Sequence, residues 1–176
     1  MAKTYNTVPD KAAGDTFTEA MWDDYVKTNG NNLIVPASCR VTQSGGTSLS
    51  DNTETTVAFA SEAWDTDSMH DTVTNNSRIT IQTAGVYLIT AGLGVTVATE
   101  VLAAMLRVNG STYIARNQDA MTTSAFAQYV TVVAAYSFAA ADYVELRALQ
   151  DNTANTSRTT DTTFTWMSAV WLGKAS

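Results

Sequence analysis

The segment AWDTDSMHD gathers the residues whose types and spacing could do chemistry. It holds three aspartates, Asp65, Asp67 and Asp71, and the only histidine of the chain, His70. Ca²⁺ takes about six to eight oxygen ligands, but this segment lacks the Gly and the distal Glu of a calcium-binding loop. We therefore expect a solvated turn whose Asp side chains accept hydrogen bonds from nearby backbone amides. A metal site at the three aspartates is the alternative.

The other residues do not readily form a catalytic site. As a general base, His70 would need a nucleophile and an orienting partner, and the sequence shows neither, so we expect a surface or turn histidine. Cys39, the single cysteine, cannot form a disulfide within the chain and is expected to be a small buried hydrophobe. A carboxyl pair suited to glycoside cleavage could arise by chance among 17 acidic residues. We predict a protein that is not an enzyme and needs no cofactor.

The composition limits the class of protein. Of the 176 residues, 45% are hydrophobic, enough for one domain with a core, whereas only 15% are charged. Thr, Ser and Asn replace Lys and Glu, which is typical of an all-β extracellular or virion protein. The net charge of −7 repels a phosphate backbone, so no nucleic-acid partner is expected. No apolar run approaches the ~20 residues of a membrane span, and the N-terminus lacks the apolar core of a secretory signal.

Residues 1–32 differ from the rest and are predicted to form an arm followed by a short helix. Thr16 or Thr18 can cap the helix, and Gly30 is expected to end it after about three turns. Its apolar stripe comprises Phe17, Met21, Trp22 and Tyr25. Because such a helix is marginal alone in water, the stripe needs a surface, either the β domain of its own chain or a neighbouring subunit.

From residue 33 to residue 176 the hydrophobic pattern has a period of two, which predicts strands. The candidates are residues 33–43, 55–64, 77–82, 83–95, 100–110, 111–118, 124–138, 142–150 and 162–173. Asn109-Gly110 indicates a type I′ hairpin, since both central residues of that turn need positive φ. Many short strands and a single helix predict an all-β sandwich of about 8–10 strands.

The strand TAGVYLITAGLGV, residues 83–95, is apolar on both faces at its beginning. Tyr87, Ile89 and Ala91 lie on one face, whereas Val86 and Leu88 lie on the other. We assign the Tyr87 face to the core of the sandwich. The Val86 face must then be covered by something other than the core, and Thr90, Gly92 and Gly94 mark where that contact becomes narrower. The strands at 124–138 and 162–173 have the same two-sided character.

Residues 55–173 resemble the complement-type globular head, a relative of the tumour necrosis factor jelly roll. The motifs that carry the resemblance are Trp64-Asp65, the short strand 78–81, Gly85-Val86-Tyr87-Leu88-Ile89, LRVNGSTYIA and ADYVEL. One departure is Ala141, which stands where Gly usually precedes Asp142. The resemblance implies a jelly-roll head that assembles as a homotrimer, with Val86 and Leu88 covered by neighbouring subunits near the three-fold axis.

Residues 14–33, GDTFTEAMWDDYVKTNGNNL, resemble the segment that opens many tailed-phage structural proteins. The matching residues are Gly14, Asp15, Thr18, Met21, Tyr25, Val26, Asn29 and Leu33. The resemblance implies a bacteriophage virion protein, either a capsid decoration or head fibre or a short tail appendage. The resemblance also implies that the protein is located in the virion. It would contact other virion proteins through Phe17, Met21, Trp22 and Tyr25.

Two other functions remain open at this stage. The head could be an adhesin that recognises host-surface glycans through loops at residues 44–54 and 150–161, because loops on a rigid scaffold often carry binding. The weaker possibility is an enzyme that degrades host polysaccharide. A glycan array and an assay for released reducing sugar would distinguish these from a purely structural protein.

Overall fold

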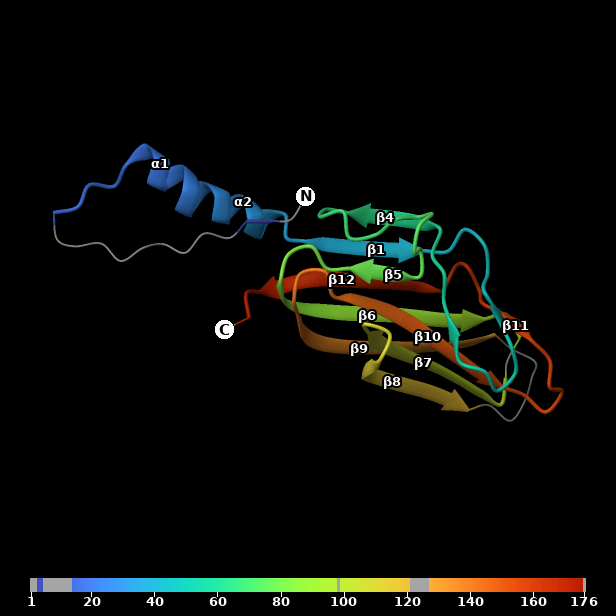
Figure 1. The fold of residues 1–176 in the computed structure, drawn as a ribbon. Coiled ribbons are helices and arrows are strands. Elements are labelled where there is room, and N and C mark those ends of the chain that lie inside the picture. The colour runs from blue at the N-terminus through green and yellow to red at the C-terminus, as the bar shows by residue number, and fades with distance from the viewer. Residues whose placement is uncertain (1–2, 5–13, 98, 121–126, 176) are drawn as a thin grey trace.

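The chain folds as a sandwich of two antiparallel sheets with a helix projecting beyond one end (Figure 1). The structure is a computed structural model, and it describes residues 3–4, 14–97, 99–120 and 127–175. The arm at residues 5–13 lies outside these ranges. The alternating sequence pattern therefore produces the expected all-β jelly roll with one helical segment.

Five strands form the sheet that we call sheet I. In order across the sheet they are β4 (Ser61–Asp65), β1 (Ser38–Thr42), β12 (Trp166–Gly173), β6 (Gly85–Val95) and β9 (Gln128–Phe138). All four pairings are antiparallel. The strand with two apolar faces, β6, thus lies inside the sheet, hydrogen-bonded on both sides.

The second sheet, sheet II, packs against sheet I. Its strands are β3 (Thr55–Thr56), β10 (Tyr143–Asp151), β7 (Val101–Val108) and β8 (Thr112–Ala120), and β5 (Arg78–Thr80) pairs with β10. A separate pair joins β2 (Ser48–Leu49) to β11 (Arg158–Thr159). Both members of this pair come from segments expected to be turns, and the predicted strand at 55–64 is divided into β3 and β4.

The core lies between the two sheets, and alternate residues of each long strand enter it. On β10, Val144, Leu146 and Ala148 are fully buried, while their neighbours in sequence are only partly buried. On β6, Tyr87 and Ile89 are fully buried. The predicted assignment of the Tyr87 face to the core is confirmed.

Two turns test the predictions about backbone conformation. Asn109 and Gly110 have φ of 50° and 69°, as the type I′ prediction requires, and they connect β7 to β8. Ala141 also has positive φ, 72°. The turn before β10 therefore keeps the left-handed conformation although Ala replaces the Gly of the resembling family, with a steric cost to the side chain.

The helix is longer than expected. Thr18 caps it, its side chain accepting a hydrogen bond from the Met21 amide, and the segments α1 (Glu19–Met21), η1 (Trp22–Lys27) and α2 (Thr28–Ile34) follow without a break. The prediction that Gly30 ends the helix is wrong, because the helix continues to Ile34. Gly30 does not have positive φ, which a C-terminal glycine stop commonly uses. The first strand correspondingly begins at Ser38.

Candidate functional site

The side of β6 that faces away from the core is apolar and uncovered. Tyr87, Ile89 and Ala91 are at most 1% exposed, whereas Leu88 is 36% exposed and Val86 is partly buried. The structure thus separates the two faces along the strand as the sequence pattern predicts.

The neighbouring strands extend this apolar surface. Leu88 lies opposite Val170 on β12 and Ala135 on β9. Two register positions further, Val133 on β9 is 58% exposed, and Leu172 near the end of β12 is 56% exposed. We call the resulting surface the outer face of sheet I. It comprises Val86, Leu88, Val133, Ala135, Val170 and Leu172, with Trp64, Tyr129 and Phe164 at its margins.

Glycines on β6 make room for aromatic rings of the same chain. A Cβ on Gly92 would come within 2.7 Å of the Trp166 indole nitrogen, and one on Gly94 within 2.8 Å of the Tyr129 ring. The Tyr129 ring packs in turn on Phe164, with 4.4 Å between the ring centroids. At this end of β6, aromatic rings of the same chain therefore cover the outward side of the strand. This is a physical reason why the apolar surface left for a neighbouring subunit should become narrower there.

A single cation lies between two indoles at the other side of the outer face. The guanidinium carbon of Arg40 is 4.0 Å from the centroid of the Trp166 ring and 5.8 Å from that of Trp64. Such cation–π contacts stabilise by roughly 0.5–2 kcal/mol, more when water is excluded. The two indoles thereby hold the Arg40 guanidinium in place.

The helix carries the second uncovered apolar surface. Phe17 and Trp22 are each 53% exposed and meet edge to face at 6.3 Å, while Met21 and Tyr25 are partly buried. None of the helical residues is buried, and the helix extends away from the sandwich (Figure 1). Within the described residues, the β domain of the same chain therefore does not bury the helix stripe, which leaves a neighbouring subunit as the other predicted surface.

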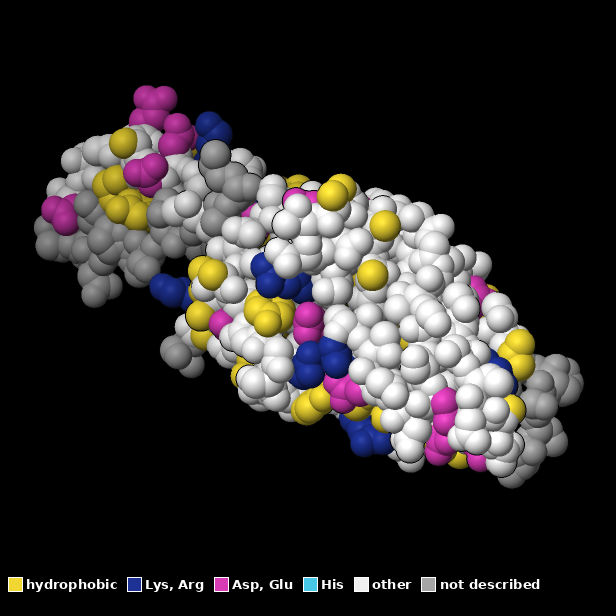
Figure 2. All heavy atoms as spheres, turned by 45° about the vertical axis from the view of Figure 1, so that its right-hand side comes forward, with side chains coloured by type: hydrophobic (Ala, Val, Ile, Leu, Met, Phe, Trp, Pro, Cys, Tyr) yellow, Lys and Arg dark blue, Asp and Glu magenta, His cyan; other side chains and the backbone are white. Residues whose placement is uncertain are grey.

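Figure 2 shows hydrophobic side chains gathered on the helix among acidic ones, beside a sandwich whose visible face is mostly uncharged. The acidic residues of the helix are Glu19, Asp23 and Asp24, and Lys27 pairs with Asp23 at 3.3 Å. The helix is thus amphipathic, with an exposed apolar stripe ready for a surface of another molecule.

The segment from Asp65 to Asp71 is a hydrogen-bonded turn. The Asp65 carboxylate accepts from the amides of Asp67, Met69 and His70 at 2.6–3.0 Å. The Asp71 carboxylate accepts from two further amides, those of Val73 and Thr74, at 2.8 Å, and these bonds lower the Asp71 pKa. Both aspartates therefore organise the backbone, the role that the turn interpretation gives them.

Asp67 is the exception in that turn, because it is buried and not solvated as expected. One carboxylate oxygen accepts from the Thr83 hydroxyl at 2.8 Å, and the other is buried without a partner. Burial raises the Asp67 pKa, and the Thr83 hydrogen bond opposes that shift only in part. Within the described ranges, no group of three or more His, Cys, Asp or Glu side chains is placed to hold a metal ion.

His70 is a turn histidine, one of the two expected alternatives, because its amide belongs to the Asp65 turn, but its side chain does not lie at the surface. Its side chain is 0% exposed, with Nδ1 2.9 Å from Glu62 Oε1 and Nε2 3.2 Å from the Asn76 carbonyl oxygen. Each ring nitrogen thus faces an oxygen atom of a different residue. His70 therefore ties the loop before β5 to the edge strand β4.

Cys39 is fully buried on β1 as a free thiol, in agreement with the sequence prediction. Burial strongly raises the pKa of the thiol, and the negative charges of Asp65 and Glu62 raise it further. The side chain consequently packs as a small hydrophobe, because the reactive thiolate is strongly disfavoured.

The two segments named as candidate glycan loops are tied down by polar contacts. The Asn152 side chain donates to Gln150 Oε1 and to the Thr156 carbonyl, both at 2.7 Å. The β2–β11 pairing joins residues 48–49 to residues 158–159. The two segments therefore brace one another through the β2–β11 pairing.

Among the described residues, no helix combines the length and the apolar character that a membrane span requires.

The fold has well-matched counterparts among solved structures, although the sequence does not. No family model and no curated protein sequence matches the chain. Murine APRIL at pH 5.0 superposes with a TM-score of 0.61 at 11% identity, covering 77% of this chain and 98% of that one. The globular domain of a zebrafish complement 1qA protein gives 0.60 at 11% identity, covering 79% and 99%. The tumour necrosis factor Eiger from S. frugiperda gives 0.56 at 17% identity, covering 80% and 94%. The comparisons establish a jelly roll of the tumour necrosis factor and complement globular-head type.

Proposed function

We propose that this chain is a non-enzymatic structural protein of a tailed-phage virion, in which a homotrimeric jelly-roll head is joined to the particle by its N-terminal arm and helix. The observation that carries the proposal is the presence of two separate uncovered apolar surfaces, one on sheet I and one on the helix. Exposed apolar patches of this kind mark protein–protein contacts. Two surfaces provide for two different contacts, one among subunits and one with the particle.

The outer face of sheet I is the proposed subunit interface. Its centre holds aliphatic side chains, and Arg40 at its side is stacked against indoles. Burying a large aliphatic side chain contributes ~1.5–3 kcal/mol, and a closed three-fold ring would bury several such side chains on every subunit. The resemblance to trimeric jelly rolls, found in the motifs around β6, supports the same arrangement.

Light scattering after size exclusion tests the trimer. A particle of about three times the 18.8 kDa chain mass is expected at micromolar concentration. A monomer at that concentration would overturn the proposed assembly, whatever the outcome for particle binding.

The helix stripe is the proposed contact with the particle. Four aromatic or large side chains, Phe17, Met21, Trp22 and Tyr25, could contribute ~1.5–3 kcal/mol each on full burial, enough for stable docking after ordering costs. The resemblance of residues 14–33 to the opening segment of tailed-phage structural proteins supports this role.

A truncation that begins at Pro36 separates the two contacts. Pro36 is retained because its carbonyl oxygen accepts from the Thr66 hydroxyl at 2.8 Å and so belongs to the sandwich. The truncated head is expected to fold and to trimerise but not to co-sediment with phage particles. As a milder variant, Trp22→Ser should weaken co-sedimentation, whereas Asp24→Asn is the matched control on the same helix. Normal co-sedimentation of the truncated head would refute attachment through the helix.

A further inference from the structure

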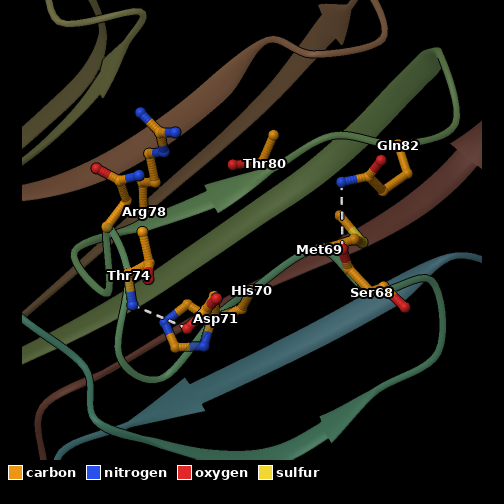
Figure 3. Close-up of a pocket in the computed structure, with 9 residues that line it drawn as sticks. Ser68, Met69, His70, Asp71, Thr74, Arg78, Thr80 and Gln82 are labelled. Carbon is orange, nitrogen blue, oxygen red and sulfur yellow. Dashed lines mark hydrogen bonds between the residues drawn. The ribbon is translucent and has the colours of Figure 1, made fainter.

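A polar pocket opens on the sandwich, and none of its lining residues belongs to either apolar surface. Its volume is about 390 Å³, and the loop before β5, β5 itself and the residues just after it line it. Figure 3 shows Arg78, Thr80 and Gln82 along one side and Ser68 to Asp71 with Thr74 along the other. Pockets of roughly 300–1,000 Å³ are the usual size for small-molecule sites, so this one can hold a group as large as a sugar ring.

Arg78 is the cation of this pocket, and it lacks an acceptor. Its guanidinium carbon lies 4.6 Å from the centroid of the Tyr143 ring, which fixes the side chain. Within the part of the chain that the structure describes, no hydrogen bond or salt bridge engages the guanidinium, and its Nε is buried without a partner. The guanidinium therefore has no acceptor among the described residues, and its terminal nitrogens can donate to an oxygen of a ligand in the pocket.

The opposite side of the pocket offers acceptors. Asp71 uses Oδ1 for the amides of Val73 and Thr74, and those bonds lower its pKa and keep it ionised. Figure 3 shows the Arg78 guanidinium directed away from Asp71, and no salt bridge joins them. The pocket thus has a cationic side and an anionic side, with the Thr80 hydroxyl and the Gln82 amide in its lining.

Two other features keep the pocket in shape without any ligand. Gln82 Nε2 donates to the Ser68 carbonyl oxygen at 3.2 Å, joining the two sides. His70 lines the pocket while its ring nitrogens contact Glu62 and Asn76. The loop that forms one wall is therefore held against the sandwich, which lowers the ordering cost of binding.

We propose that this pocket binds a small polyol that carries an acidic group, with the acidic group at Arg78 and hydroxyl groups donating to Asp71. A guanidinium pairs with carboxylate or phosphate through parallel hydrogen bonds, and neutral hydroxyls suit an ionised carboxylate. Sugar acids and polyol phosphates share this chemistry. The site lies within one chain and is formed by residues other than those of the two proposed protein contacts, so its test is independent of both. With a net charge of −7 the protein gives an anion no long-range attraction, so single small ligands should bind weakly, with dissociation constants of the order of 1 mM.

Ligand-observed saturation-transfer NMR on the full chain tests the proposal. The probes are glucuronate and N-acetylneuraminate for carboxylates, glycerol 3-phosphate for a polyol phosphate, and glucose as the neutral control. At least one acidic probe should give saturable transfer, and glucose should not. Which probe binds shows whether the pocket prefers a sugar carboxylate or a polyol phosphate. Arg78→Gln should weaken that binding about tenfold or more, equivalent to ~1.4 kcal/mol, and Arg78→Lys should restore part of it.

Arg116→Gln is the matched control, since Arg116 is exposed on β8, outside the pocket, and donates to Gln118. Thermal unfolding of each variant checks that the head remains folded. Absence of saturable transfer from all acidic probes at about 50 mM, well above the expected dissociation constant, would overturn the proposal. Equal weakening by Arg78→Gln and Arg116→Gln would also overturn it, because binding would then follow overall charge and not the pocket.

Discussion

Leu88 and Val170 lie directly opposite one another on β6 and β12, and both side chains point out of the sandwich. In the single chain this pair lies at the surface, and both side chains remain at least partly exposed to solvent. If three chains assemble through this face, the pair becomes the centre of a buried interface. A charge placed there would then have no counter-ion.

Leu88→Asp is therefore expected to break the trimer without unfolding the head, and Val86→Asp should act in the same way. An unpaired carboxylate buried in the interface costs about 3 kcal/mol or more, which corresponds to at least roughly a hundredfold weaker association. Light scattering and circular dichroism would show a folded monomer. Val73→Asp is the control, because Val73 is 84% exposed on a loop away from the outer face of sheet I; an equal effect of that variant would argue against a specific interface.

Tyr87 should behave in the opposite way, since it lies on the core side of the same strand. Its hydroxyl donates to the Thr83 carbonyl oxygen at 2.6 Å in the interior, and its ring meets Phe138 edge to face. Tyr87→Phe should lower the free energy of unfolding by about 1–3 kcal/mol, because a buried carbonyl loses its partner. Tyr87→Asp should prevent folding, and chemical denaturation followed by fluorescence measures both effects. A folded Tyr87→Asp monomer would contradict the assignment of the two faces.

Ala141→Gly should stabilise the protein. Ala141 has φ of 72°, a conformation that costs a non-glycine residue about 1–2 kcal/mol. Glycine removes that strain but adds freedom to the unfolded chain, worth roughly 0.5–1 kcal/mol. A net gain of about 0.5–1 kcal/mol is expected from denaturant unfolding. Ala140→Gly is the matched control: Ala140 does not have positive φ, so only the entropic loss remains and stability should fall.

How far the sequence predicts this protein depends on whether the decisive contacts are local. The period of two along β6 assigns Tyr87 and Leu88 to opposite faces, because strand geometry fixes that alternation. Asn109-Gly110 likewise predicts its turn from two residues alone. The burial of His70 could not be found in this way, since it depends on Glu62 and Asn76, which the fold brings to it from either side. The pocket at Arg78 is not predictable in this way either: its lining residues lie within residues 68–82, but which of them face one another depends on how the loop folds back, as in the Gln82–Ser68 hydrogen bond. The only signal in the sequence was an arginine at the start of a short strand.

Cys39 should be unreactive until the protein unfolds. It is fully buried, and burial together with the nearby carboxylates strongly raises the thiol pKa, so the nucleophilic thiolate is scarce. A chromogenic disulfide reagent should give no signal from the native protein at neutral pH and one equivalent in denaturant. Ser111→Cys, at an exposed turn position, is the positive control and should react at once. Rapid labelling of native Cys39 would show that β1 opens readily.

Asp67→Asn should stabilise the head at neutral pH and not in acid. Burial raises the pKa of Asp67 above its ordinary 3.8 in the folded state, so the folded protein holds this proton more tightly than the unfolded chain does. Stability from this group is therefore greatest below the unfolded pKa and is lost as the pH rises through the folded pKa. In the variant, the Asn side chain keeps an oxygen that accepts from the Thr83 hydroxyl. Because Asn carries no charge, the variant does not lose stability through this position as the pH rises. The gain in free energy of unfolding over the natural protein should be near zero at about pH 3 and should grow toward pH 7, as measured by denaturant unfolding across that range. Carboxyl groups remote from Asp67 are common to both proteins and cancel in the difference, whereas Asp65 interacts electrostatically with Asp67. A difference that is flat with pH would refute the raised pKa.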